Sequence, residues 1–164
     1  MDQKFAIDKR VLDEAEIKYS IGYLQAIVNI YDELWNENPR ILMENFNEDQ
    51  ITLLFYGVLC NQVQNGGFLQ LIFNGYAPYV FSEPMIDGLR SWGAVATADL
   101  LASIADRGLQ VDGEMDKTSL ESLSKSYDRY PEFKKHDQDF YANDGLQEVK
   151  DHVRGRLSDF VLVV

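Results

Sequence analysis

The chain has few of the residues on which disulfide frameworks, thiol catalysis and membrane insertion depend. It contains a single cysteine, Cys60, in a stretch without charged side chains. One cysteine excludes a disulfide framework within the chain, and a thiol without a cationic neighbour is typically an inert core residue. The N-terminus is charged and is followed by no apolar signal segment, and no uninterrupted apolar run reaches the roughly 20 residues of a membrane span. We therefore expect a cytoplasmic protein that does not enter a membrane.

Motifs for nucleotide binding and hydrolysis are also missing. The sequence contains neither GxGxxG nor GxxxxGK[ST], and the GxSxG of a nucleophile elbow is absent. The run with Asp112, Glu114 and Asp116 resembles the opening of a calcium loop. However, Lys117 stands where that loop needs glycine, and Leu123 stands where it needs the bidentate glutamate. We expect neither a calcium site nor a cofactor.

The two histidines give only a weak indication of metal binding. His136 and His152 fall on different expected helices, among lysines and arginines. They could join Asp137, Asp139 or Glu148 in a metal site, but isolated surface histidines are the commoner case. Paired carboxylates are too abundant to single out a general acid and base. We therefore expect a protein without catalytic residues, and an enzyme or metal protein stays an alternative.

Residues 50–82 contain no charged side chain, although 26% of the whole chain is charged. Apolar residues recur at helical spacing in the first half of this stretch. Asn47 and Gln50 form a capping-box pattern that predicts the start of a helix, and Gly66-Gly67 predicts its end. A second short helix is expected over residues 68–74, ending at Gly75. These two helices are expected to be the buried centre of the fold.

The flanking sequence predicts further helices and no strand pattern. Ser20 is the expected cap of a helix over residues 20–36, and Ser82 or Glu83 is the expected cap of one that begins with Pro84. Gly108 is expected to end the following helix. The remaining expected helices start at Thr118 or Ser119, at Pro131 and at Gly145, and the apolar tail 160–164 must be covered by the core or by a dimer interface. We predict a single, compact all-α domain over residues 1–164.

Acidic residues outnumber basic ones by 27 to 15, which gives a net charge of −12. Such a charge repels nucleic acid and anionic lipid and attracts a basic partner. The acidic residues are densest over residues 32–49, where Arg40 is the one base. Asp32, Glu33 and Glu37 lie near the C-terminal end of their expected helix, where the helix dipole disfavours them. This placement suggests a role other than stability.

The spacing of the carboxylates is compatible with a row of phosphates. Residues four apart on a helix are separated by about 6 Å along its axis, comparable to neighbouring phosphates of a B-DNA strand. Glu33 with Glu37, Glu44 with Glu48, and Asp144 with Glu148 and Asp151 have this type of spacing. The candidate phosphate-mimicking carboxylates are Asp32, Glu33, Glu37, Glu44, Glu48, Asp49, Asp144, Glu148 and Asp151.

The motif NQVQNGGFLQLIFNG over residues 61–75, with its central NGGF, is followed by an alanine-rich helix that contains Trp92-Gly93-Ala94. Together with the closing segment 120–160, it resembles a family of small bacterial proteins that includes a nineteen-kilodalton DNA mimic. The resemblance implies an all-helical fold and DNA mimicry. It also implies a homodimer whose joined surface extends the negative track.

We therefore expect a DNA mimic that inhibits a transcription factor and so regulates transcription. It would bind the DNA-reading surface of a basic, dimeric helix-turn-helix factor and keep it from its operator, without binding nucleic acid itself. The alternative is a general interaction or immunity-type module whose groove is formed by aromatic rings near Pro78. These rings are Tyr76, Tyr79, Phe81 and Trp92. The interpretation that these rings close the core over a loop is favoured over a groove.

Overall fold

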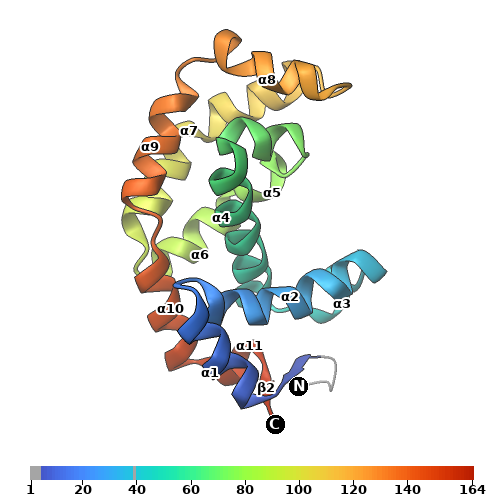
Figure 1. Cartoon of the computed structure of the whole chain (residues 1–164), viewed down its shortest axis with the longest axis vertical. Coiled ribbons are helices and arrows are strands. Elements are labelled where there is room, and N and C mark those ends of the chain that lie inside the picture. The colour runs from blue at the N-terminus through green and yellow to red at the C-terminus, as the bar shows by residue number, and fades with distance from the viewer. Residues whose placement is uncertain (1–4, 39) are drawn as a thin grey trace. The chain divides into compact units, whose positions relative to one another are not determined.

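The structure is a computed structural model that describes residues 5–38 and 40–164, apart from the side chains of residues 41–43. Helices dominate these residues, which confirms the predicted all-α class (Figure 1). The chain forms two compact units. The first unit contains the described residues up to Gly57 together with Leu146–Val164, and the second unit is Val58–Gly145. The single domain over residues 1–164 stays a prediction. Among the described helices, none combines the length and the apolar character needed to cross a bilayer.

The first unit is built around α2, against which α1 and α10 pack (Figure 1). Its elements are β1 (Ala6–Ile7), α1 (Lys9–Lys18), α2 (Gly22–Glu37), α3 (Arg40–Asn45), the start of α4 (Glu48–Phe73), α10 (Leu146–Gly155), α11 (Leu157–Phe160) and β2 (Leu162–Val163). The buried Tyr31 ring lies edge-on to Phe5 and Phe46. Its hydroxyl donates to the carbonyl of Phe160 at 2.6 Å. The ends of the chain are thus joined to α2 through the core.

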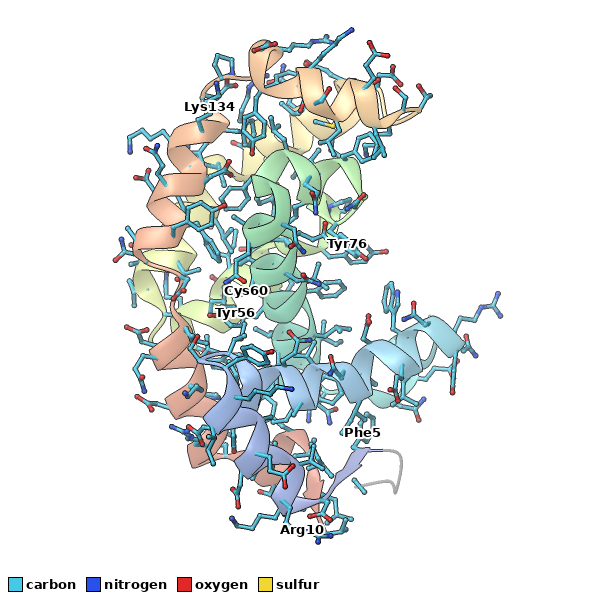
Figure 2. The ribbon with its side chains drawn as sticks, viewed as in Figure 1. Phe5, Arg10, Tyr56, Cys60, Tyr76 and Lys134 are labelled. Carbon is cyan, nitrogen blue, oxygen red and sulfur yellow. The ribbon has the colours of Figure 1, made fainter. Side chains whose placement is uncertain are left out.

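The second unit is built around α7, against which α5, α6 and α9 pack. Its elements are the rest of α4, α5 (Ala77–Val80), α6 (Glu83–Ser91), α7 (Val95–Glu114), α8 (Leu120–Arg129) and α9 (Phe133–Ala142). Cys60, on the part of α4 that belongs to this unit, is 2% exposed, as expected for a core thiol (Figure 2). The neutral stretch therefore contributes core residues to both units through one helix.

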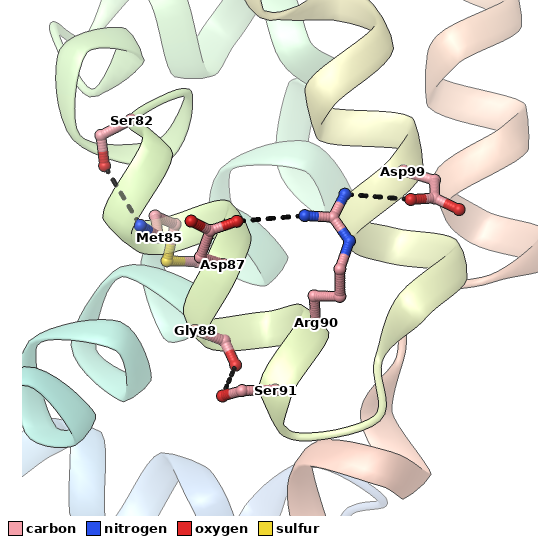
Figure 3. Close-up of polar contacts among 7 residues, drawn as sticks. All are labelled: Ser82, Met85, Asp87, Gly88, Arg90, Ser91 and Asp99. Carbon is pink, nitrogen blue, oxygen red and sulfur yellow. Dashed lines mark hydrogen bonds and ion pairs between the residues drawn. The ribbon is translucent and has the colours of Figure 1, made fainter.

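Side-chain caps begin several helices where the sequence predicted them. At α4, the Asn47 Oδ1 atom accepts from the Gln50 amide at 2.8 Å, and Gln50 Oε1 accepts from the Asn47 amide at 3.0 Å. This confirms the capping box. Ser82 caps α6 through the amide of Met85 (Figure 3), and Ser119 caps α8.

The predicted cap at Ser20 is wrong. Helix α2 begins at Gly22, and its N-cap residue Ile21 makes no side-chain capping bond. The position where α2 starts is set by contact with α1, because a Cβ atom on Gly22 would overlap the carbonyl of Ala15. Only glycine fits so close to the backbone of another helix.

The predicted stop at Gly66-Gly67 is confirmed as a sharp break inside α4. Gly66 has φ −165° and ψ 18°, and Gly67 has φ 77° and ψ −177°. The positive φ of Gly67 is a conformation that other residues rarely adopt. The second half of α4 then runs to Phe73, and Gly75, with φ 84°, follows its end as predicted.

Two features of the fold differ from the sequence prediction. Gly108 does not end a helix, since α7 continues to Glu114. It is needed because a Cβ atom there would overlap the ring of Phe81. The second feature is a short parallel pairing of β1 with β2, which joins Ala6 to Leu162 in register. This pairing, together with the burial of Phe160 and Val161, covers part of the tail within the chain.

We expect Gly67→Ala to lower the free energy of unfolding by about 2 kcal/mol or more. The substitution combines a strained φ with a Cβ atom that overlaps the Tyr127 hydroxyl and the Asp137 carboxylate. Gly113→Ala is the matched control, because no described atom lies within 4 Å of its added Cβ. It should stabilise α7 by about 0.5 kcal/mol. Urea denaturation measures both values, and equal stabilities of the two variants would show that the fold does not require glycine at position 67.

Candidate protein-interaction surface

The acidic segment, residues 32–49, lies entirely in the first unit. Asp32, Glu33 and Glu37 occupy the last part of α2, Glu44 lies on α3, and Glu48 and Asp49 form the first turn of α4. All are exposed except Asp49, which is half-buried. Six carboxylates therefore gather on consecutive helices.

Most of these carboxylates are not neutralised by the chain. Within the described residues, no lysine, arginine or histidine nitrogen lies within 4 Å of the side-chain oxygens of Asp32, Glu33, Glu37, Glu44 or Glu48. Arg40, the base inside the segment, forms no ion pair with a described carboxylate, and its backbone amide donates to Asn38. The segment thus has a concentrated negative field.

Acidic residues elsewhere in the first unit mostly have basic partners. Arg10 pairs with Asp8 at 2.8 Å, and Lys9 pairs with Asp13 at 2.6 Å. Glu16 on α1 forms ion pairs with Lys150 and Arg154 of α10. Arg156 pairs with Asp159 at 2.8 Å.

Several carboxylates of the second unit also have basic partners. Arg90 bridges Asp87 on its own helix, α6, and Asp99 on α7, at 3.1 and 3.0 Å (Figure 3). Arg107 pairs with Glu132 at 2.9 Å. Such surface pairs contribute little to stability, but they remove charge locally. Among the described residues, the ion pairs thus leave Asp32, Glu33, Glu37, Glu44 and Glu48 as a concentrated group of carboxylates without a basic partner.

The carboxylate of Glu37, in the last turn of α2, is unfavourable for the helix. Its last turn contains no basic residue. Acidic side chains at the C-terminal end of a helix each cost a few tenths to about 1 kcal/mol. Glu48 and Asp49, in contrast, lie in the first turn of α4, where the dipole favours them. Stability therefore explains the acids of α4 but does not explain those of α2.

The predicted rows of carboxylates are confirmed only in part. Glu33 and Glu37 share α2, so the spacing of about 6 Å along the axis applies to them. Glu44 and Glu48 do not share a helix, because the capping box at Asn47 starts α4 after α3 has ended. The expectation of one helical row for that pair is wrong.

The third row is shorter than expected. Asp144 belongs to the second unit and precedes α10, so it is not part of a helical row. Glu148 and Asp151 do lie on α10 and are exposed. Asp151 accepts a hydrogen bond from Gln147 at 2.8 Å.

The alternative sites find less support in the structure. Phe81 and Trp92 are 3% and 6% exposed, so two rings of the expected aromatic groove belong to the core, while Tyr79 is exposed. His136 and His152 lie in different units, edge-on to Phe133 and Phe160. The described residues hold no group of three or more potential metal ligands.

A buried carboxylate at the break of α4 was not predicted from the sequence. Asp137, on α9, accepts from the amide of Phe68 at 2.8 Å and from the hydroxyl of Tyr127 at 2.5 Å. Burial raises the pKa of Asp137, and these two hydrogen bonds oppose that shift. Burial also raises the pKa of Tyr127. The sequence offered only a weak signal, an aspartate at a position of α9 that faces the core.

These features define a class of small, acidic, helical proteins with a concentrated group of unpaired carboxylates. The chain belongs to the DMP19-like protein family, whose family model matches residues 44–161. It is 30% identical over 144 residues to the DNA mimic protein DMP19 of Neisseria meningitidis, covering 84% of this chain and 86% of that protein. The matched family range contains the break in α4, Glu44 and Glu48. It leaves Asp32, Glu33 and Glu37 outside.

The free energy of unfolding gained from Asp137 should decrease as pH rises above about 4. A carboxyl whose pKa is higher in the folded chain stabilises the fold fully below its unfolded pKa and loses this contribution as pH rises through the folded value. Urea denaturation of the wild type and of Asp137→Asn between about pH 4 and pH 8 should therefore show a difference that falls with pH.

Asp128→Asn is the control for that series, because Asp128 is exposed on α8 and has no ion pair with a described residue. Its stability should follow the wild type across the pH range. If the difference for Asp137→Asn rises with pH instead, the hydrogen bonds from Phe68 and Tyr127 outweigh the effect of burial.

Proposed function

We propose that the protein is a DNA mimic that binds the DNA-binding surface of a basic helix-turn-helix transcription factor. Bound there, it would keep the factor from its operator and so regulate transcription. The observation that carries the proposal is the acidic segment, in which Asp32, Glu33, Glu37, Glu44 and Glu48 have no ion pair with a described base. The chain is also a member of a family that includes a named DNA mimic. Competition of this kind requires no catalytic residue and no cofactor.

The acidic segment has the chemistry that a phosphate-reading surface recognises. DNA-binding proteins hold the backbone mainly through lysine and arginine side chains and backbone amides. Carboxylates accept the same charge-assisted hydrogen bonds as phosphate oxygens. Since Glu33, Glu37 and Glu48 have no ion pair with a described base, no such pair has to be broken before a partner binds.

A dimeric partner favours a dimeric mimic. Helix-turn-helix factors commonly read two half-sites with a two-fold symmetric pair of recognition helices. A homodimer of this protein would offer the acidic segment twice, related by the same symmetry. We propose the homodimer and a cytoplasmic location, where such a factor would be met, as parts of the same function.

Reversing the charge of Glu33, Glu37, Glu44 and Glu48 to lysine should lower the affinity for the partner by about a hundredfold or more. Exposed charge pairs contribute up to about 1 kcal/mol each, and reversal replaces attraction with repulsion. The helical circular dichroism should stay unchanged, because all four side chains are exposed. The partner is first captured from a native cell extract, identified by mass spectrometry and purified for titration.

A matched control variant distinguishes the effect of where the reversed charges lie from the effect of the change in net charge. Reversal of Glu14, Asp106, Glu114 and Asp128 to lysine changes the net charge equally, and these exposed acids lie outside the acidic segment. This control should bind within about threefold of the wild type. Equal loss in both variants would mean that total charge, and not the acidic segment, attracts the partner.

Binding should also weaken steeply with salt and compete with DNA. Raising the salt concentration from about 50 to about 500 mM shortens the Debye length severalfold and should reduce the affinity by more than about tenfold. Added operator DNA should displace the protein from the factor in a gel-shift titration. Salt-insensitive binding that is lost in Tyr79→Ala would instead support the aromatic-groove alternative.

A further inference from the structure

A cavity of about 260 Å³ lies in the second unit, between the end of α7 and α8. Met115 forms an apolar part of its lining, and Lys125, Arg129 and Tyr130 contribute from α8 and its C-cap. Its volume is below the roughly 300 Å³ at which sites for drug-sized ligands begin. The space therefore suits a small ligand. This cavity has no part in the proposed function, whose acidic segment belongs to the first unit.

Two hydrogen-bond donors on this cavity have no acceptor among the described residues. The Arg129 guanidinium lies 5.3 Å from the centre of the Tyr130 ring and forms no ion pair or hydrogen bond with a described side chain. The Tyr130 side chain is 3% exposed, and its hydroxyl has no hydrogen-bond partner there. An unpartnered buried hydroxyl is rare and costly, so that of Tyr130 calls for an explanation. Arg129 is exposed, so its guanidinium is solvated by water and can turn to a ligand without breaking a described ion pair.

The carboxylate that lines the cavity, in contrast, already accepts hydrogen bonds. Asp116 accepts from the amide and hydroxyl of Thr118 through one oxygen and from the Ser122 hydroxyl through the other. These hydrogen bonds lower the pKa of Asp116. The other basic side chain of the lining, Lys125, already donates to Glu121 at 2.5 Å. What the cavity lacks is therefore an acceptor for Arg129 and Tyr130, and a cation would find no free carboxylate there.

We infer that this cavity binds a small organic carboxylate. Its two oxygens would accept from the guanidinium of Arg129, whose planar geometry matches a carboxylate. Its apolar body would lie on Met115. The phenol is covered in the free chain, and movement of Arg129 toward the ligand would open it to the same carboxylate. The net charge of −12 opposes anion binding, so we expect millimolar affinity.

The test is a titration of the full chain with sodium benzoate, followed by amide chemical shifts at constant ionic strength. Benzamide has the same shape without the charge, and acetate has the charge without the ring. Benzoate should shift the amides of residues 115–130 and bind about tenfold more tightly than either probe. Equal binding of benzamide and benzoate, or shifts confined to other residues, would overturn the inference.

Arg129→Gln should weaken benzoate binding by about tenfold. Lys134→Gln is the matched control, because it removes one positive charge from an exposed side chain of the same unit, on α9 (Figure 2). It should leave the titration unchanged. If Arg129→Gln binds benzoate like the wild type, or if Lys134→Gln is equally impaired, the guanidinium is not the recognising group and the inference is wrong.

Tyr130→Phe tests the second donor, the Tyr130 hydroxyl. It also shows whether that hydroxyl stabilises the chain without ligand. Because the hydroxyl has no described partner, its removal should not lower the melting temperature without ligand, yet it should weaken benzoate binding about threefold or more. A clear loss of melting temperature without ligand would mean that the hydroxyl is already satisfied. Either that result or unchanged benzoate affinity would remove Tyr130 from the site.

Discussion

The fold depends on satisfying buried backbone groups with side chains from distant parts of the sequence. Breaking α4 at Gly67 frees the Phe68 amide inside the second unit, and the Asp137 carboxylate from α9 accepts from it. The Val63 carbonyl just before the break accepts from the Tyr141 hydroxyl at 2.8 Å. Without these partners, each buried group would cost about 1–3 kcal/mol. The break in α4 and the position of α9 are therefore one structural feature.

The first unit uses the same solution at its chain end. The Phe160 carbonyl accepts from the Tyr31 hydroxyl and from the Gln50 side chain, at 2.6 and 3.0 Å. Gln50 is also half of the capping box of α4, so one residue both starts that helix and holds α11. This double use positions the first turn of α4, with Glu48 and Asp49, by contacts on its buried side. The candidate surface is thus held by the core and not by its own charges.

The features that were predicted correctly from the sequence are those determined by residues close together in the chain. The capping box at Asn47, the cap at Ser82 and the glycine break each depend on a few consecutive side chains. The predicted helix boundaries were wrong where contact with a residue distant in the sequence determines the local structure. Gly108 was predicted to end a helix, but the position requires glycine because the Phe81 ring packs against it. Helix α2 starts at Gly22 because the backbone of α1 lies against that residue.

The candidate surface shows the same limit. Composition located the acidic segment, but no spacing rule indicates that Lys150 and Arg154 lie beside Glu16, more than a hundred residues away in the chain. Which carboxylates stay unpaired therefore emerged only from the structure.

The unpaired acids of α2 affect both the stability of the helix and the electrostatic field of the surface. In the last turn of the helix, Glu37 lowers stability by up to about 1 kcal/mol, and a nearby base would remove that cost. Ion pairs with lysine would also cancel the local field, on which attraction of a basic partner depends. The chain instead places its ion pairs elsewhere, as with Arg90 between α6 and α7. A surface arranged for stability alone would put some of those bases at the end of α2, whereas a surface that attracts a basic protein would have to leave them out.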